Sequence, residues 1–178
     1  MAAYYYVKSG GTATGDAGRY TTQQTGSFAD LGAANYYATI DAALDALTPS
    51  AGGDFICVSD IHSYIAGASV THSPCPAGDT IPLTIMSVSD TAIDTYAKAA
   101  APQEGTTGSK AIHLNGTVSG RACYEGMFFS TYYRVTPGGL ASNSFTTLRD
   151  CTLRSGGSND VLLYLGADGG LQSYIIQT

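Results

Sequence analysis

The chain has 178 residues, of which 14 are acidic and 8 basic, so its formal net charge at pH 7 is −6. Only 12% of the residues are charged, about half the usual share, whereas 44% are hydrophobic and 22 are glycine. This length predicts a single domain. Because Gly, Ser and Thr are poor residues inside helices, their abundance disfavours a helical bundle and favours a β-rich structure with many turns.

The composition also excludes several classes of partner. Eight cations leave no basic surface for nucleic acid, which is bound by Lys and Arg against phosphates. No apolar run approaches the roughly 18 residues needed to cross a membrane, and the segment from Met1 to Lys8 does not have the pattern of a secretory signal. We expect no cofactor and no metal. The four cysteines form no C-x-x-C pair, and we expect buried, reduced thiols at Cys57, Cys123 and Cys151, whereas Cys75 lies in a predicted loop and is the one candidate for a reactive thiol.

The first 47 residues predict a strand, an arm and a helix, in that order. Tyr4 to Val7 is the strand, and the Gly- and Thr-rich stretch at 9–35 is a long loop or extended arm. The helix spans 36–47, because its apolar residues recur three and four positions apart. Asn35 is the expected cap.

Short strands separated by turn residues follow from residue 53. Runs at 55–60 and 81–90 both contain Val-Ser-Asp, and residues 125–128 are similar to residues 150–153, twenty-five positions on. Degenerate repetition of this kind predicts a β-solenoid, and a β-sandwich is the alternative. The other predicted strands lie at 111–114, 145–148, 161–165 and 173–176.

The order of these elements resembles a known family. The strand at Tyr4, the Gly/Thr-rich loop, the helix at 35–44 and the strand at 53–58 are together similar to the amino-terminal end of right-handed parallel β-helix proteins of the pectin-lyase-like type. The runs at 59–63, 112–116 and 124–128 resemble a subgroup, the β-helical structural proteins of tailed bacteriophages.

This resemblance implies an all-β fold, a right-handed parallel β-helix (solenoid) with an N-terminal capping helix and an extended N-terminal arm. The strand and arm would occupy 1–35, and the helix-capped β-helix body 36–178, either as a whole protein or as the amino-terminal part of a longer chain. It implies location in a virion assembled from protein made in the host cytoplasm.

Two groups of residues are candidates for catalysis. Asp60 and His62 lie two apart beside Ser59 and Ser63, but no G-x-S-x-G motif exposes a serine nucleophile. Glu125 stacked on Asp150 would suit a glycosidase. The favoured alternative for these carboxylates is a solvated ladder that pairs with nearby cations, namely Arg121, Arg149 and Arg154.

Turn aspartates are the candidates for a metal site. Their oxygens are suitable calcium ligands, but they are not spaced as in an EF-hand loop, and turn aspartates more often bond to the backbone. They are Asp54, Asp60, Asp79 and Asp90. No residue is therefore assigned as catalytic, cofactor-binding or metal-binding.

Tyrosine is the most unusual aromatic feature, with 13 residues against 5 phenylalanines and no tryptophan. Adjacent tyrosines on a strand face opposite sides, so some rings are expected at an interface. These candidate interaction residues are Tyr4, Tyr5, Tyr6, Tyr36, Tyr37, Tyr132 and Tyr133.

The expected function is that of a non-enzymatic virion structural protein, a capsid decoration or a fibre or tail component. It would act by self-assembly into a homo-oligomer (a trimer or a polymer) and by contact with other virion proteins, with surface glycans as a further partner. The alternatives are a carbohydrate-active enzyme (a polysaccharide depolymerase or lyase) and a glycan-binding adhesin.

Overall fold

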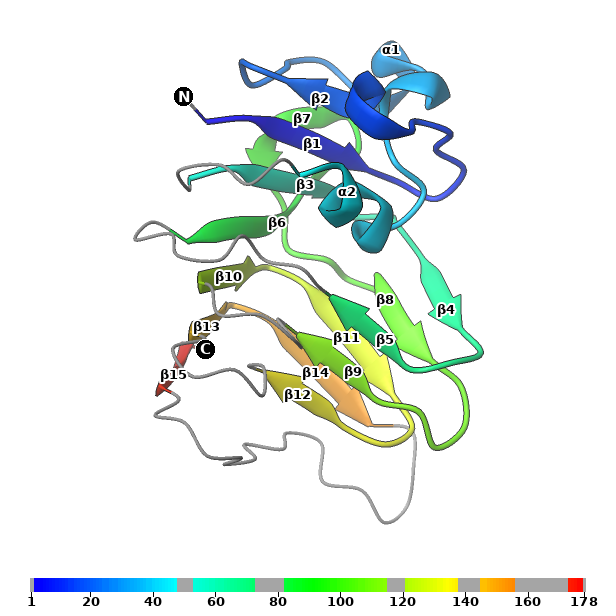
Figure 1. Cartoon of the computed structure of the whole chain (residues 1–178), viewed down its shortest axis with the longest axis vertical. Helices are drawn as coiled ribbons and strands as arrows, with labels where there is room; N and C mark the ends of the chain where they lie inside the picture. The colour runs from blue at the N-terminus through cyan, green and yellow to red at the C-terminus, as the bar shows by residue number, and fades with distance from the viewer. Residues whose placement is uncertain are drawn as a thin grey trace.

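The computed structural model describes residues 2–47, 53–72, 82–114, 121–137, 145–155 and 173–177, and it arranges their strands in three sheets (Figure 1). Sheet A contains β1 (Tyr4–Val7), β2 (Arg19–Tyr20), β3 (Phe55–Ser59), β6 (Leu83–Ser89), β7 (Ala92–Tyr96), β10 (Arg121–Glu125), β13 (Phe145–Arg149) and β15 (Ser173–Gln177). Sheet B contains β4 (Tyr64–Ala66), β8 (Glu104–Thr106), β11 (Phe128–Thr131) and β14 (Thr152–Ser155). Sheet C contains β5 (Val70–His72), β9 (Ile112–Leu114) and β12 (Val135–Pro137).

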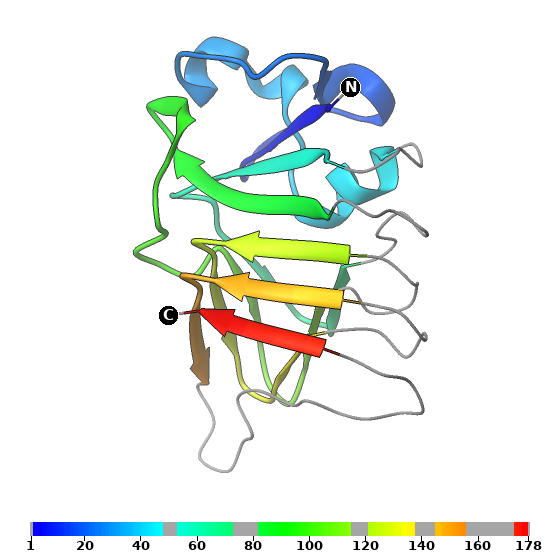
Figure 2. The same ribbon diagram turned by 90° about the vertical axis from the view of Figure 1, so that its left-hand side faces the viewer.

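From β3 to β14 the chain contributes strands to sheets A, B and C in repeated order, with β7 as an additional strand of sheet A. Most strands pair in parallel with a strand from an earlier or later repeat of this order, as in β3 with β6 and β10 with β13. Figure 2 shows the parallel strands of sheet A one above another. Residues far apart in the sequence are thereby brought into neighbouring positions.

The expectation of an all-β, right-handed parallel β-helix is wrong. Sheet A is mixed, because β2 runs antiparallel to β1 and β7 runs antiparallel to β6. Among the described residues there are three separate sheets and no closed solenoid, with a few short helices. Short strands bounded by turn residues are common to many β-rich architectures, so the weak repeat did not specify a uniform parallel stack.

Most of the predicted strands are confirmed, with shifts of a residue or two at their ends. The segment at 161–165 and the cysteine at 75 lie outside the described residues. The three-residue strands β4, β5, β8 and β12 were missed because so short a run carries no measurable alternation. Cys57 and Cys123 are buried and free, as predicted, and Cys151 is free and half-buried.

Helix α2 (Ile40–Ala46) is shorter than the helix predicted at 36–47. It begins after Thr39, whose hydroxyl accepts the N–H of Ala42 at 3.1 Å. The expected cap, Asn35, instead ends the 3-10 helix η2 (Ala33–Asn35). Tyr37 lies in an extended bridge with Val7, so hydrogen bonding to β1 replaces the first predicted turn of the helix.

The predicted arm is folded onto sheet A. It contains the 3-10 helix η1 (Gly15–Gly18), β2 and α1 (Phe28–Leu31), which begins with a capping box of Ser27 and Asp30. Phe28 packs edge-on against Tyr6 and Tyr36. The outer face of sheet A is therefore covered at its amino-terminal end.

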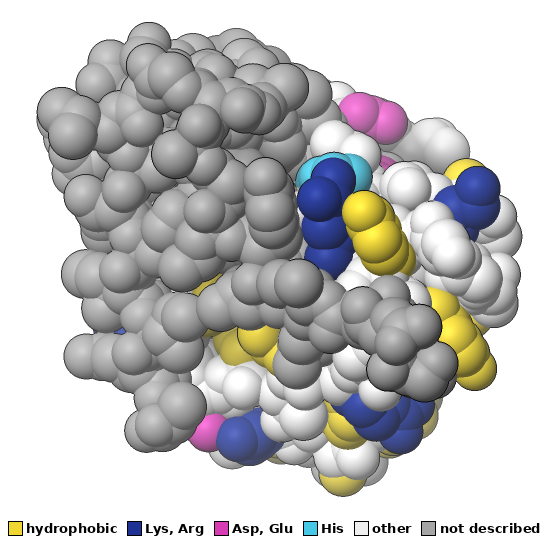
Figure 3. Space-filling view, turned by 90° about the horizontal axis from the view of Figure 1, so that it is seen from below, with side chains coloured by type: hydrophobic (Ala, Val, Ile, Leu, Met, Phe, Trp, Pro, Cys, Tyr) yellow, Lys and Arg dark blue, Asp and Glu magenta, His cyan; other side chains and the backbone are white. Residues whose placement is uncertain are grey.

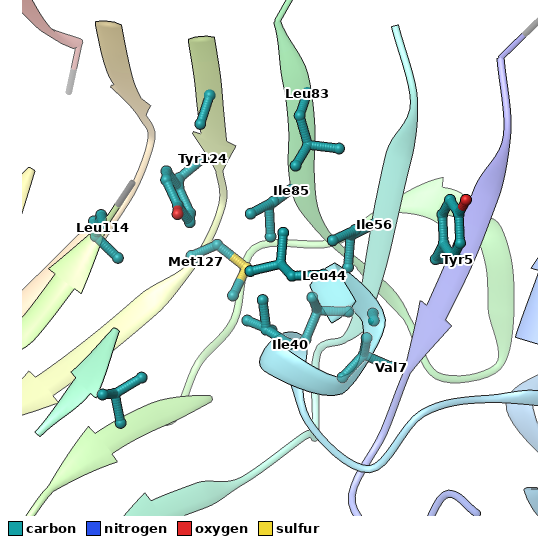
Figure 4. Packing of buried hydrophobic residues seen from close by; sticks show 14 of the residues in the cluster. Tyr5, Val7, Ile40, Leu44, Ile56, Leu83, Ile85, Leu114, Tyr124 and Met127 are labelled. Carbon is teal, nitrogen blue, oxygen red and sulfur yellow. The ribbon is translucent and has the colours of Figure 1, made fainter. Parts of the chain in front are cut away.

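The main core lies on the inner face of sheet A. Tyr5, Ile56, Ile85 and Tyr124 occupy one continuous row across neighbouring strands and are fully buried. Leu44 of α2 lies among these side chains (Figure 4). Burial of large apolar side chains from α2 and several strands holds the layers together.

Candidate functional site

The seven predicted interaction tyrosines have different environments. Tyr5, Tyr6 and Tyr37 are fully buried, and Tyr36 is 9% exposed. Tyr4 is half-buried and its ring stacks on Phe55, with ring centroids 5.1 Å apart. Tyr132 and Tyr133 are 51% and 39% exposed, respectively, so within this set the adjacent pair after β11 presents the most aromatic surface to a partner.

A buried threonine anchors the turn that carries these two tyrosines. Thr131 Oγ1 donates to the carbonyl oxygen of Lys110 at 2.7 Å and accepts the N–H of Tyr133 at 3.1 Å. Thr106 Oγ1 lies 3.0 Å from Thr131 Oγ1 and 2.8 Å from the same carbonyl oxygen. Since both threonines are buried, the turn is held from inside the fold, and binding would cost little ordering entropy.

Arg134 adds a cation beside the exposed rings. Its guanidinium carbon lies 4.8 Å from the centre of the Tyr133 ring, within the range of a cation–π interaction. The carbonyl oxygen of Arg134 accepts the N–H of Ile112 at 2.9 Å, which ties the turn to β9. Tyr and Arg are enriched at the energetic centres of protein interfaces. We call Tyr132, Tyr133 and Arg134 the aromatic turn.

The described part of the lower end of the molecule has a mixed surface. Figure 3 shows Lys and Arg side chains next to hydrophobic ones there. Arg154 provides another such contact, since its guanidinium carbon lies 5.3 Å from the centre of the Phe128 ring. Aromatic and cationic side chains in contact are suited to a protein partner.

We expect Thr131→Val to lower the free energy of unfolding by about 1–3 kcal/mol, because the part-buried N–H of Tyr133 loses its acceptor and a buried hydroxyl is removed. Thr106→Val is the matched control, since it removes a buried hydroxyl but leaves that N–H bonded to Thr131. Urea unfolding at pH 7 measures both. An equal loss in the two variants would contradict the anchoring role of Thr131.

Strand β4 is a second exposed apolar feature. It lies at the end of sheet B and pairs, within the described part of the chain, with β8. Ile61, Tyr64 and Ile65 are 61%, 37% and 50% exposed. Ile65 lies over Gly105, where an added Cβ would meet its Cδ1 at 2.5 Å. An open edge with exposed apolar side chains can pair with another chain.

Asp60 and His62 do not form the pair that their spacing allowed. Asp60 Oδ1 accepts the backbone N–H of Asp90 at 2.9 Å, and the hydroxyl of Ser59 donates to Asp90 Oδ1 at 2.8 Å. These bonds join the turns after β3 and β6. The carboxylate of Asp60 therefore bonds to the backbone of Asp90, whereas His62 lies beside Ser9 and Glu104.

His62 lies between Ser9 and Glu104. Its Nδ1 is 3.2 Å from Ser9 Oγ, and its Nε2 is 3.6 Å from Glu104 Oε1. This is the residue order of a catalytic triad, but the hydroxyl of Ser9 donates to the carbonyl oxygen of Ser63 at 2.7 Å, so its proton points away from the imidazole. Burial lowers the pKa of His62 to about 4, which makes it a weak base near neutral pH. The sequence did not indicate Ser9 or Glu104, because both are distant from His62 along the chain.

Glu125 and Asp150 do not stack on each other. The strands pair with an offset of one residue from the predicted repeat, so Glu125 lies opposite Arg149 and pairs with it at 3.4 Å. Asp150 accepts from Lys98 Nζ and from the Tyr96 hydroxyl, both at 2.6 Å. These hydrogen bonds lower the pKa of Asp150. Each carboxylate is thus engaged by its own cation. Arg149 is one of the cations expected for the ladder alternative, but Lys98 is not, and the two carboxylates form no ladder.

Among the turn aspartates, Asp60 is hydrogen-bonded to the backbone of Asp90. Asp54 Oδ1 accepts the N–H of Ala3 at 2.7 Å. Asp79 and the side chain of Arg121 lie outside the described residues. Within the described ranges, no three His, Cys, Asp or Glu side chains are arranged to hold a metal ion. No helix there is long and apolar enough to cross a membrane.

Comparisons with protein-family models, with curated proteins and with solved structures find no match for this chain.

Proposed function

We propose that this chain is a non-enzymatic structural protein that acts through self-assembly, with the aromatic turn as its contact surface. The observation that carries the proposal is the pair of exposed adjacent rings held by the buried hydroxyl of Thr131. Rigid aromatic side chains bury much area at low entropic cost. Strand β4, which ends sheet B in the described part of the chain and carries exposed apolar side chains, gives further support, because edge strands can add to sheets of other copies.

The setting that we propose is a tailed-phage particle, as a capsid decoration or as a fibre or tail component, with other particle proteins as partners. This setting rests on the resemblance of the sequence to structural proteins of tailed bacteriophages, whereas the proposed contact rests on the aromatic turn. A surface with few charges, 12% of all residues, is compatible with close packing of neighbouring copies, because few ions must be desolvated.

We expect the wild-type protein to associate with increasing concentration and the double variant Tyr132→Ala/Tyr133→Ala to associate at least about 30-fold more weakly, because truncation of an interface hot spot, a class enriched in tyrosine, costs about 2 kcal/mol or more. Size-exclusion chromatography coupled to light scattering, at two concentrations, measures this. Tyr96→Ala removes an exposed ring on β7 of sheet A and is the control.

Three results would contradict the proposal. A wild-type protein that stays monomeric at high concentration would count against self-assembly. An equal weakening in Tyr96→Ala would count against the aromatic turn as the contact. Binding in a glycan screen by a monomer, lost in the double variant, would instead favour the adhesin alternative.

A further inference from the structure

Three ionisable side chains from separate elements lie near one another at helix α2: His62 Nε2 is 3.6 Å from Glu104 Oε1, and the charge of Glu104 acts on Asp41. Asp41 lies in the first turn of α2, His62 lies in the turn that leads into β4, and Glu104 is the first residue of β8. His62 and Glu104 are no more than 1% exposed. Within the described part of the chain, three of their buried polar atoms have no hydrogen-bond partner: Asp41 Oδ1, His62 Nε2 and Glu104 Oε2.

The surroundings of this cluster add negative rather than positive charge. Asp45, on the same helix, acts on Asp41 together with Glu104. The backbone N–H of Ile40 and the hydroxyl of Ser9 are uncharged neighbours of Glu104 and His62, respectively. Lys8, which precedes Ser9, is held by Asp90 at 2.8 Å. The two carboxyl groups therefore depend on bound protons for neutrality.

Burial sets the protonation states near neutral pH. It raises the pKa of Glu104 to about 8, against a smaller opposing effect of the Ile40 N–H. Burial, then the charges of Glu104 and Asp45, raise the pKa of Asp41 to about 7. Burial lowers the pKa of His62 to about 4. At pH 6 the protonated carboxyl of Glu104 faces a neutral imidazole, so the contact is not an ion pair.

We propose that the Asp41–His62–Glu104 cluster is a pH-sensitive latch, which holds α2 and β4 in place while it is uncharged and releases them when its carboxyl groups lose their protons. The released elements are short: α2 has seven residues and β4 has three. Tyr64 of β4 pairs directly with Glu104. Ile40 and Leu44 of α2 are fully buried in the main core (Figure 4), so release of the helix exposes apolar surface.

The direction of the pH effect follows from linkage. The pKa values of Glu104 and Asp41 in the folded protein lie above their ordinary values of 4.5 and 3.8. The stability that these two groups contribute is therefore fully present below about pH 4, falls progressively as the pH rises, and is lost above about 7 for Asp41 and about 8 for Glu104. Because His62 stays neutral in that range, it supplies no compensating positive charge.

Hydrogen–deuterium exchange at pH 6.0 and pH 8.5, with labelling times scaled for the intrinsic rates, tests the latch. In the wild-type protein we expect residues 37–47 and 60–66 to lose at least about tenfold protection at pH 8.5, relative to residues 121–125 of β10. Glu104→Gln, which keeps the shape and cannot ionise, should remove most of this loss. Glu125→Gln, at the exposed pair with Arg149, should leave it unchanged.

The proposal is overturned if the wild-type protein shows no such loss, or if Glu104→Gln shows the same loss as the wild type. Should Glu104→Gln fail to fold, Asp41→Asn serves as the second variant, because it removes the partner charge from α2. Asp41→Asn is then expected to halve the loss at least, and an unchanged loss overturns the latch. Since the readout is local protection in a monomer, it is independent of the proposed self-assembly.

Discussion

We expect Gly11→Ala to lower the free energy of unfolding by about 3 kcal/mol, which would lower Tm by roughly 6–12 °C. Gly11 lies where the arm crosses the chain between η2 and α2. An added Cβ would lie 2.6 Å from the carbonyl carbon of Tyr37 and 2.7 Å from its oxygen. Both are backbone atoms, and the N–H and carbonyl oxygen of Tyr37 are hydrogen-bonded to Tyr6 and Lys8. The clash therefore cannot be relieved by a rotamer change.

Gly67→Ala is the matched control for this variant. An added Cβ at Gly67 has no heavy atom within 4 Å, and its backbone does not have a positive φ. We expect no loss of stability there, and a gain of up to about 1 kcal/mol from the stiffer unfolded chain. Thermal unfolding of both variants at one pH measures the difference. Equal Tm values would mean that the arm is not packed against Tyr37.

We expect His72 to remove stability as the pH falls below 6.5, in opposition to Glu104 and Asp41, whose contributions grow in that direction. His72 Nδ1 is 3.2 Å from the Tyr124 hydroxyl and the two rings are stacked. Its Nε2 has no hydrogen-bond partner among the described residues. Protonation makes both ring nitrogens donors, so one N–H would face no acceptor. Burial accordingly lowers the pKa of His72 to about 3.

The sign and size of this effect follow from the two pKa values. A pKa lowered from 6.5 means that the unfolded chain takes up the proton first, so the contribution is full above pH 6.5 and lost as the pH falls towards 3. At pH 4.5 the loss from His72 is about 3 kcal/mol. In His72→Phe, which keeps a ring and cannot titrate, the change in the free energy of unfolding from pH 7 to pH 4.5 should be more favourable than in the wild type by that amount.

Urea unfolding at pH 7, 5.5 and 4.5 measures this difference. His113→Phe, at a half-buried histidine on the neighbouring strand β9, is the control and should keep most of the wild-type acid dependence. An acid dependence that is the same in His72→Phe and the wild type would show that His72 does not remain neutral in the folded protein.

The local patterns of the sequence were sufficient to predict several elements. β1, β3 and β6 coincide with apolar runs bounded by Gly, Asp or Ser, and a single face of apolar residues predicted α2. These are contacts between near neighbours, which composition and periodicity record directly. The helix start was misplaced because Thr39 caps it, while Tyr37 gains hydrogen bonds to β1, and those bonds come from distant residues.

The weak sequence repeat did not predict the register in which β10 pairs with β13. The similarity of 125–128 to 150–153 suggested an offset of twenty-five residues, but the ladder places Glu125 opposite Arg149. A slip of one residue reverses the face of every side chain. The same offset turns a candidate pair of catalytic carboxylates into two separate contacts with Arg149 and Lys98.

By itself the sequence determined a β-rich chain with few charges, the positions of several strands but not of β7 or β10, and the opposite orientations of adjacent tyrosines. The tertiary structure alone decided that Tyr5 and Tyr6 are both buried, because α2 and α1 cover the two faces of sheet A. It also decided that Tyr132 and Tyr133 are exposed, and that His62 meets Ser9 and Glu104. Such contacts join residues that are far apart in the chain. They depend on the register of the sheets and on which sheet faces are covered by other layers, and these two factors leave no local pattern in the sequence.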